Sequence, residues 1–411
     1  MSRGRLNDYY SGIGFKRLRA TEVDSATSHG HEFQGISVFR NLFGTGRQEL
    51  KASLLYLSDH QDDVISQTGD LSWYDSREHD PNRSAEYRLY YPADITIVQE
   101  YAEPGDLVVI GRKPDDSIDV LIADAGSTFE RQLLWLFAID ESELEENFHT
   151  KELQGTGSLD IAGQHILEYI GIEVDLHGED FLDDMLERFG PGFPDTRTFS
   201  AYARENSPAD SSLDGPDSVL LAWIEREEML FRALEKYIVS NRLKQGFADD
   251  VDGFIAYSLS VLNRRKSRAG QAMEHHLEHA FQEHGISYSR GKITENRSRP
   301  DFLFPGVKEY HDPVYPQGQL LMLGVKTTCK DRWRQVLSEA EKIRLKHLFT
   351  LEPAISEYQT DEMKQKNLQL VLPAALHISY THGQQAWLMN LEDFFDLAKN
   401  RGAPITSGGL F

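Results

Sequence analysis

The sequence has little cysteine, no long apolar run and no glycine-rich phosphate loop, and each shortage narrows what the chain can be. A single cysteine, Cys329, among 411 residues excludes an intramolecular disulfide and is typical of a reducing compartment. No apolar run approaches the roughly eighteen residues of a membrane span, and the N-terminal MSRGRLNDYYSG has no apolar signal core. We therefore expect a cytoplasmic protein with no membrane partner.

Two glycine-containing segments and the cysteine could suggest chemistry, but simpler roles fit them better. The GTG sequences at Gly44–Gly46 and Gly155–Gly157 lack the flanking lysine and helix of a nucleotide-binding loop, so we expect each to form a turn. Cys329 follows Lys326 closely in an apolar context, which is more typical of a packing residue than of a nucleophile. Nothing in the sequence indicates ATP chemistry.

Length and charge predict two domains and one basic surface. A chain of 411 residues exceeds what one hydrophobic core usually organises. The net charge of −23 is unevenly spread: residues 100–218 hold 28 acidic and 7 basic side chains, whereas residues 262–350 hold 10 acidic and 16 basic ones. A locally basic surface on an acidic protein is the electrostatic pattern expected for binding nucleic acid.

The first part of the chain, residues 1–175, predicts a mainly β domain. Short β-prone runs separated by Gly, Pro, Asp and Asn are typical of a barrel or sandwich. We expect strands at 36–39, 53–57, 87–91, 95–99, 107–110 and 118–122, followed by a helix at 128–137.

The rest of the chain divides into a linker and an α/β domain. Residues 176–218 are acidic and rich in Pro, Gly and Ser, which predicts a flexible linker. The domain of residues 219–411 opens with apolar residues at helical spacing up to Gly246. Two further helices are expected at 252–262 and 269–284, with Gly285 as the stop signal after the second.

Charged residues flank two apolar runs of strand length in this α/β domain. Phe302–Phe304 follows Asp301 directly, and Leu320–Val325 is followed by Lys326. Glu339 lies thirteen positions after Lys326, on a segment with helical spacing. Two carboxylates can hold Mg²⁺ while the ion keeps several waters, and a lysine beside them can orient the attacking water and stabilise developing charge. We therefore predict Mg²⁺-assisted phosphodiester hydrolysis, with Asp301 and Glu339 as metal ligands and Lys326 as the catalytic lysine.

These motifs resemble a known family of nucleases. A PD dipeptide, a strand-borne lysine and an acid displaced onto the next helix are similar to the permuted PD-(D/E)XK pattern. Four longer segments resemble the EcoRII-like type II restriction endonucleases: Asn263–Gly270 (NRRKSRAG), Pro300–Pro305 (PDFLFP), Tyr310–Asp312 (YHD) and Val325–Gln335 (VKTTCKDRWRQ). In the first half, Lys16–His31 and Asn82–Pro92 are similar to that family's effector-binding domain, a pseudobarrel like plant B3 domains.

The resemblance implies a type IIE restriction endonuclease. Such an enzyme would be a homodimer that cuts double-stranded DNA at a CC(A/T)GG-like or related CC:GG site with Mg²⁺. Residues 1–175 would bind an effector copy of the site and otherwise cover the catalytic cleft of residues 219–411. A cognate DNA methyltransferase would be its genetic partner. Tyr310 matches an active-site tyrosine of the family, and Glu274 matches an acid on the first core helix that often points at the metal.

The resemblance also implies DNA contacts. Lys330, Asp331 and Arg332 correspond to a triplet that reads CC:GG pairs, since Lys and Arg donate to guanine and Asp accepts from cytosine. A lysine where some relatives have arginine loses the bidentate fork. The further candidates are Arg264 and Arg268 for phosphate, and His31, Arg83, Glu86 and Arg88 for base edges in the N-terminal domain.

Several alternatives stay open at this point. His275, Glu278 and His279 spell the HxxEH motif of zinc metallopeptidases, although a solvated helix face explains the histidines better. The chain could also be a DNA-binding regulator with a decayed nuclease centre. Glu86 and Arg88 could pair with each other across a strand, Asp331 could cap a helix, and Tyr310 could be a packed loop aromatic.

Overall fold

The computed structural model describes residues 5–23, 31–34, 36–61, 64–80, 82–153, 159, 161–172, 181–330 and 332–402. The chain divides into two compact units. Unit 1 is Met1–Val174 with Pro353–Tyr358, and unit 2 is Asp175–Glu352 with Gln359–Phe411. The division after Val174 falls next to residue 175, where the sequence places the end of the β domain.

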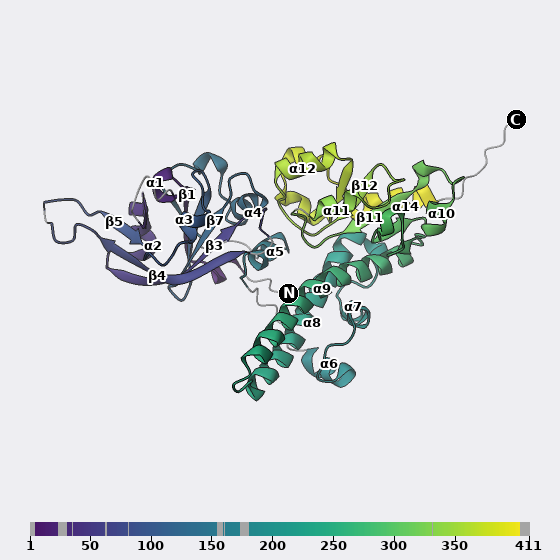
Figure 1. Ribbon diagram of the computed structural model, residues 1–411, viewed down its shortest axis with the longest axis horizontal. Helices are drawn as coiled ribbons and strands as arrows, with labels where there is room; N and C mark the ends of the chain where they lie inside the picture. Colours follow the sequence, from purple (N-terminus) through teal and green to yellow (C-terminus); the bar gives the residue numbers. More distant parts are fainter. Residues whose placement is uncertain are drawn as a thin grey trace. The chain divides into compact units, whose positions relative to one another are not determined.

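Unit 1 is built on one eight-stranded sheet (Figure 1). Its strands lie in the order β2-β5-β4-β3-β7-β6-β1-β8. All neighbours are antiparallel except β3 and β7, which run parallel. The strands are β1 (Gly12–Arg17), β2 (Glu32–Phe33), β3 (Gln48–Leu57), β4 (Ile65–Asp75), β5 (Tyr87–Tyr90), β6 (Leu107–Arg112), β7 (Ile118–Ala123) and β8 (His149–Glu152).

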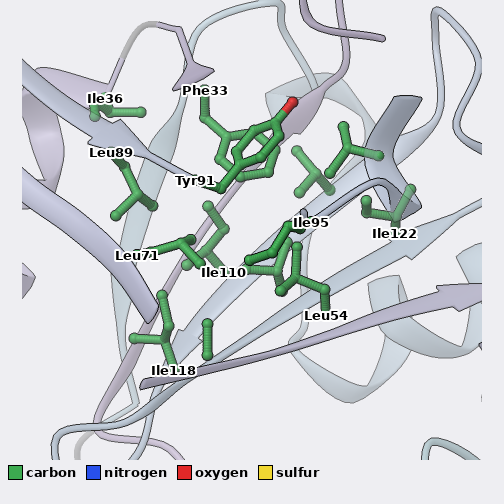
Figure 2. Close-up of a cluster of buried hydrophobic side chains, with 14 of the residues drawn as sticks. Phe33, Ile36, Leu54, Leu71, Leu89, Tyr91, Ile95, Ile110, Ile118 and Ile122 are labelled. Atoms are coloured by element: carbon green, nitrogen blue, oxygen red, sulfur yellow. The ribbon is translucent and has the colours of Figure 1, made fainter. Parts of the chain in front are cut away.

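Alternating side chains of these strands form the core of unit 1. Leu54 of β3, Ile110 of β6 and Ile118 of β7 are fully buried there. Figure 2 shows them packed with Leu71 and Leu89 of the neighbouring strands. Because side chains alternate across a sheet, a single apolar face is enough to anchor all of these strands.

Short helices cover the sheet of unit 1. Ser127 caps α4 by accepting a hydrogen bond from the backbone of Glu130, at an N···O distance of 3.1 Å. The helices are η1 (Leu6–Asp8), α1 (Ala20–Val23), η2 (Ile36–Phe39), α2 (Arg40–Phe43), α3 (Ile97–Tyr101), α4 (Thr128–Leu136), η3 (Glu141–Glu143) and α5 (Ile161–Tyr169).

Four of the expected strands in unit 1 are confirmed and two are wrong. The runs at 53–57, 87–91, 107–110 and 118–122 lie largely in β3, β5, β6 and β7, and the helix at 128–137 is α4. The run at 36–39 is instead a 3-10 helix, η2, and the run at 95–99 leads into α3. Both bury apolar side chains against the core, and a run of four or five residues is too short for its periodicity to separate strand from helix.

Unit 2 combines a five-stranded mixed sheet with helices, so its predicted α/β character is confirmed. The order is β13-β12-β11-β10-β9, with β9, β10 and β11 antiparallel and β11, β12 and β13 parallel. The strands are β9 (Ser289–Arg290), β10 (Phe302–Phe304), β11 (Leu321–Val325), β12 (Lys346–Phe349) and β13 (Leu368–Val371).

Two long antiparallel helices, α8 and α9, lie side by side in unit 2 (Figure 1). Phe281 of α9 packs against Phe302 and Phe304 of β10, with both pairs of ring centroids 5.1 Å apart. The helices described from residue 181 onward, including these two, are α6 (Leu182–Phe189), α7 (Thr196–Glu205), η5 (Ser212–Asp214), α8 (Pro216–Gln245), α9 (Val251–Glu283), η6 (Glu295–Arg297), α10 (Val307–His311), η7 (Gln317–Gln319), α11 (Trp333–Leu337), α12 (Glu357–Gln365), η8 (Ala374–Ser379), α13 (His382–Gln385) and α14 (Leu391–Gly402).

The prediction of a flexible linker at 176–218 is wrong for residues 181–218, the part of it that the structure describes. Helices α6 and α7 occupy this segment, and Phe199 and Tyr202 of α7 are buried against Leu230 of α8. Asp195 caps α7 by accepting from the backbone of Thr198, at 3.0 Å. The Pro and Gly residues between the two helices dominate the local composition, but the helices themselves present apolar side chains to α8.

The helices expected at 252–262 and 269–284 are in fact one continuous helix, α9. The segment between them, NRRKSRAG, contains no proline, and a single Gly270 inside a helix costs only about 1 kcal/mol relative to alanine. The predicted ends are confirmed: Gly246 follows α8 at φ 74° and Gly285 follows α9 at φ 65°. Within the described ranges, no helix has both the length and the apolar character to cross a bilayer.

A buried ion pair in unit 1 yields a stability prediction. Lys16 and Glu22 are 0% and 2% exposed, and the Lys16 Nζ lies 2.6 Å from the Glu22 Oε1. Lys16→Met leaves a buried carboxylate without its cation, so we expect a loss of about 3–5 kcal/mol in the free energy of unfolding. Replacing both residues, with Lys16→Met and Glu22→Leu, should recover part of this loss. Denaturant unfolding of the full chain measures both, and a double variant no more stable than the single one contradicts the prediction.

Candidate active site

Asp301 and Lys326 meet because β10 and β11 are antiparallel neighbours. Phe302 pairs with Leu323, so the start of β10 lies beside the end of β11. The Asp301 Oδ2 accepts a hydrogen bond from the backbone N–H of Val325 at 2.7 Å and lies 3.3 Å from the Lys326 Nζ. The structure therefore brings together the acid and the lysine that the sequence singles out.

Glu339 belongs to the same site but does not lie on a helix. Helix α11 ends at Leu337, and Glu339 is followed by Ala340 in a left-handed conformation at φ 48°. The expectation of a helical position was therefore wrong, because Glu339 lies two residues beyond the end of the helix. The pKa of Glu339 is raised to about 7, chiefly by burial and also by the negative charge of Asp301. The positive charges of Lys326 and Lys346 act in the opposite direction. Glu339 thus shares one electrostatic environment with the other two predicted residues.

A third carboxylate, Glu274 of α9, lies in this environment too. Its pKa is raised, first by burial and then by the charge of Asp301, and it is lowered by Arg290 and Lys326. The Arg290 Nε and Nη2 lie 3.0 and 2.8 Å from the Glu274 Oε2. Arg290 was missed by the sequence analysis, because only the pairing of β9 with β10 shows that it lies beside Asp301.

The donor set fits a hard divalent cation. The Oε2 of Glu339 is buried and has no hydrogen-bond partner, which is the state of an oxygen that awaits a ligand. Mg²⁺ is usually held through one or two carboxylates and keeps several waters, so Asp301 and Glu339 suffice in number and kind. Among the described residues, no three His, Cys, Asp or Glu side chains form a complete metal cluster.

Tyr310 packs beside the site without pointing at the lysine. Its ring is fully buried on α10, and its hydroxyl donates to the Glu295 Oε2 at 2.5 Å. The same hydroxyl accepts from the backbone N–H of Lys342 at 3.3 Å. Burial and Glu295 both raise the pKa of Tyr310, so it stays protonated. The expected hydrogen bond to Lys326 is therefore replaced by bonds to neighbouring loops, in line with the packed-aromatic alternative.

The predicted base-reading triplet is described only in part. Arg332 is exposed and its backbone forms the N-terminal cap position of α11. Lys330 is half-buried, with its backbone in the left-handed region at φ 28°. Asp331, with its alternative role as a helix cap, lies outside the described residues.

Of the two arginines predicted to bind phosphate, Arg264 is exposed and Arg268 is not. The guanidinium of Arg264 lies 4.3 Å from the centroid of the Phe193 ring. The side chain of Arg268 is only 8% exposed and makes ion pairs with Glu227, at 3.2 Å, and Glu228 of α8. The prediction that Arg268 contacts DNA was wrong, because α9 turns this face toward α8.

The candidate readers of unit 1 form a charged cluster. Arg88 of β5 lies 3.0 Å from Glu32 of β2 and 3.5 Å from Glu86, and Glu86 lies 2.6 Å from Arg77. The ion-pair alternative for Glu86 and Arg88 is thus present. Glu32 and Arg77 were missed, because strand pairing rather than sequence spacing brings them here.

Two other candidates of unit 1 lie apart from this strand arrangement. Arg83 lies in a turn before β5, 66% exposed, with its Nε 3.4 Å from the Asp80 Oδ2, so the expected alternation along a strand is wrong for it. His31 is half-buried, with its ring 5.5 Å from that of Tyr91.

In the HxxEH motif, His275 and Glu278 contact arginine side chains, which is unfavourable for zinc binding. The Arg290 Nη1 lies 2.8 Å from the His275 Nδ1 and 2.9 Å from the Glu278 Oε2. Arg197 of α7 lies 2.8 Å from the same carboxylate oxygen. Burial, followed by the charges of Arg290 and Arg197, lowers the pKa of His275 to about 4. These cations oppose a zinc ion at this position.

The raised pKa of Glu339 predicts pH-dependent metal binding. Below a pH of about 7 this carboxylate binds a proton, and a proton and a metal ion compete for the same oxygens. We expect the affinity for Mn²⁺ to fall by up to about tenfold per pH unit from pH 7 to pH 5. Isothermal calorimetry of the full chain without DNA measures this, and Glu339→Gln should flatten the profile. An equally steep profile in Glu339→Gln contradicts the assignment.

Comparison with known proteins agrees with the motifs. Residues 231–395 match the family model described as EcoRII C terminal. A curated relative, the type II restriction enzyme EcoRII of Escherichia coli, is 46% identical over 203 residues, which are 49% of this chain and 50% of the relative. The chain thus matches about half of the length of that relative.

Solved structures resemble the chain more loosely. Metal-depleted Ecl18kI in complex with uncleaved, modified DNA aligns with a TM-score of 0.44 and 19% identity, over 58% of this chain and 88% of that one. A complex of the restriction endonuclease PspGI with substrate DNA aligns with a TM-score of 0.42 and 14% identity, over 51% and 93%. The likeness therefore rests on the sequence match, in which residues 231–395 of this chain are similar to the EcoRII C-terminal family.

Proposed function

We propose that this chain is a type II restriction endonuclease that hydrolyses double-stranded DNA with Mg²⁺ at a CC(A/T)GG-like or related CC:GG site. The observation that carries the proposal is the 3.3 Å contact between Asp301 and Lys326, with Glu339 within electrostatic range of both. The name of the curated relative, a type II restriction enzyme, supports the same activity.

The side chains have separable roles in this proposal. Bound Mg²⁺ would polarise the scissile phosphate and lower the pKa of a water. Asp301 is held by the Val325 N–H, so one of its oxygens is fixed and the carboxylate is oriented toward Lys326. The Lys326 ammonium orients the attacking water and stabilises charge that develops on the phosphate. Glu339 supplies the second carboxylate, and its protonation state sets the pH range of the reaction.

DNA reading is assigned to the segment that follows Lys326. Arg332 is exposed at the start of α11, six residues beyond Lys326, which suits a side chain that reaches base edges near the cleaved bond. Lys330 and Asp331 complete the proposed triplet, which would pair donors with guanine and an acceptor with cytosine. Arg264, exposed on α9, is proposed as a phosphate contact.

Unit 1 is proposed to be a B3-like effector domain that binds a second copy of the site and covers the catalytic cleft. The charged cluster of Glu32, Arg77, Glu86 and Arg88 offers both the donors and the acceptors that base edges require. His31 and Arg83 would contact the same DNA. The ion pairs within the cluster would have to open on binding, which favours a site with matching donors and acceptors over a nonspecific one.

Homodimer formation is supported by an exposed apolar stripe where α8 ends and α9 begins. Isolated apolar residues on a surface are ordinary, but several exposed apolar residues along one stretch of helix are typical of an interaction site. We propose that a second copy of the chain covers it. The stripe consists of Leu243, Val251, Phe254, Ile255, Leu259 and Leu262, each between 47% and 66% exposed.

We place the enzyme in the cytoplasm, where a cognate DNA methyltransferase would protect the host's own sites. A DNA-binding regulator with a decayed nuclease centre is the second candidate, and the intact Asp301–Lys326 pair argues against it. The metallopeptidase alternative is not proposed, since Glu278, which would serve as its base, accepts hydrogen bonds from Arg290 and Arg197.

Replacement of the lysine tests the nuclease directly. Lys326→Ala should lower the rate of Mg²⁺-dependent plasmid cleavage by at least about 100-fold, because a preorganised cation at the reacting phosphate is lost. Affinity for the DNA site, measured in a gel-shift assay with Ca²⁺, should change little. Mapping the ends that the unsubstituted chain produces identifies the site.

Lys364→Ala is the matched control, because Lys364 pairs with Asp361 on α12, at 3.1 Å, away from the predicted site residues. Cleavage at an unchanged rate in Lys326→Ala would contradict the catalytic role of Lys326. DNA binding by the unsubstituted chain with no cleavage at all would favour the regulator.

A truncated chain tests the proposed covering role of unit 1. The segment from residue 175 onward should cut faster than the full chain and depend less on a second DNA site. A truncation at residue 219, where the sequence predicts that the α/β domain begins, is unsuitable, because it removes α6 and α7, whose side chains share a core with α8. Single-turnover cleavage of one-site and two-site plasmids measures the effect. A folded truncated chain that is slower on both substrates contradicts autoinhibition.

A further inference from the structure

The backbone around Glu339 needs support that α11 does not give. The helix ends two residues earlier, and the left-handed Ala340 at φ 48° turns the chain back toward β12. A local turn bond links the Ile343 N–H to the Ala340 carbonyl at 2.9 Å. A carboxylate on such a turn moves with its backbone, and a metal site tolerates displacements of only about 0.5 Å.

Lys346 provides that support from the centre of the sheet. It opens β12, a strand between β11 and β13, and is only 6% exposed. Its Nζ donates to the carbonyl oxygens of Ala340 at 3.1 Å and Ile343 at 2.8 Å. Its backbone N–H donates to Asn367 at 3.0 Å, just before β13. The ammonium therefore ties both ends of the turn to a strand that cannot move freely.

The opposite side of the turn is held by separate contacts. The Lys342 Nζ donates to the Tyr310 carbonyl at 2.7 Å, and the Asn296 Nδ2 donates to the Glu341 Oε1 at 2.7 Å. These bonds involve residues at the surface of the turn. Lys346 is the buried member of the set, where hydrogen bonds are exchanged least readily with water.

The charge of Lys346 also faces the site. Burial lowers the pKa of Lys346, and the negative charge of Glu339, the strongest influence among its charged neighbours, raises it. An ammonium whose acceptors are two neutral carbonyls is costly to bury unless a carboxylate lies within electrostatic range. Glu339 meets that condition, and its buried Oε2 has no hydrogen-bond partner that would hold it otherwise.

We propose that Lys346 is a positioning residue for Glu339: it fixes the Ala340–Ile343 turn so that the carboxylate faces Asp301 and Lys326. The inference rests on the proposed function, in which Glu339 is a metal ligand. Lys346 touches neither the metal nor DNA in this account. It acts through the backbone that carries Glu339.

The experiment measures metal binding rather than cleavage. Lys346→Met keeps the length and burial of the side chain but removes its donors. In Lys346→Met, the affinity of the full chain for Mn²⁺ without DNA, measured by isothermal calorimetry, should fall about 10- to 100-fold. A loss of this size is typical when a group that orients a metal ligand is removed. Lys364→Met, the same substitution on α12, should change Mn²⁺ affinity less than about twofold, because Lys364 contacts Asp361 instead.

A second background separates positioning from a general effect on the fold. With Glu339→Gln already in place, Lys346→Met should weaken Mn²⁺ binding by less than about threefold, because the ligand that it orients is gone. An equal loss in both backgrounds, or no loss in either, overturns the proposal. If Lys346→Met does not fold, as judged by circular dichroism, Lys346→Gln takes its place, since it keeps one donor and the same comparison applies.

The outcome is distinct from that of the nuclease proposal. A chain that binds Mn²⁺ at Glu339 but cuts no DNA contradicts the proposed function and leaves the Lys346 comparison valid. A chain that cuts DNA and binds Mn²⁺ equally well with Lys346→Met overturns the positioning role alone.

Discussion

The site depends on one short contact, the hydrogen bond from the Val325 N–H to the Asp301 carboxylate. This bond exists because β10 and β11 run antiparallel with Phe302 opposite Leu323, which leaves Asp301 just outside one strand and Lys326 just outside the other. The pairing of the two strands thereby places the acid and the lysine 3.3 Å apart. Aromatic packing of Phe281 on Phe302 holds the same strand from the helical side.

Of the three carboxylates near this contact, Asp301 and Glu274 are hydrogen-bonded to a cation, whereas one oxygen of Glu339 has no hydrogen-bond partner. Asp301 has Lys326 and a backbone donor, and Glu274 has the two-pronged contact from Arg290. Glu339 has a buried oxygen without a partner and a pKa raised, chiefly by burial, to about 7. A divalent cation would provide a ligand partner for this oxygen, and its charge would favour the ionised form of the buried carboxylate.

The sequence predicts the parts of this arrangement that depend on local pattern. Strand-length apolar runs, helix-stopping glycines such as Gly246 and Gly285, and the acid and lysine at strand ends are all local signals. Features that depend on tertiary packing were missed or misjudged. Arg268 has the residue type of a phosphate ligand but faces α8, and α6 and α7 are hidden in a segment whose composition is that of a linker. The place of Arg290 depends on strand pairing, and that of Lys346 depends on how the chain turns between α11 and β12, neither of which is encoded in residue spacing.

The central claim is that Asp301 and Glu339 share one cation beside Lys326. Anomalous diffraction from crystals of this protein soaked in Mn²⁺ tests it most directly. The account predicts one strong peak within about 2.5 Å of an oxygen of each carboxylate, the Lys326 Nζ nearby, and loss of the peak in Asp301→Asn. A peak located elsewhere, or the two carboxylates too far apart to share an ion, would contradict it.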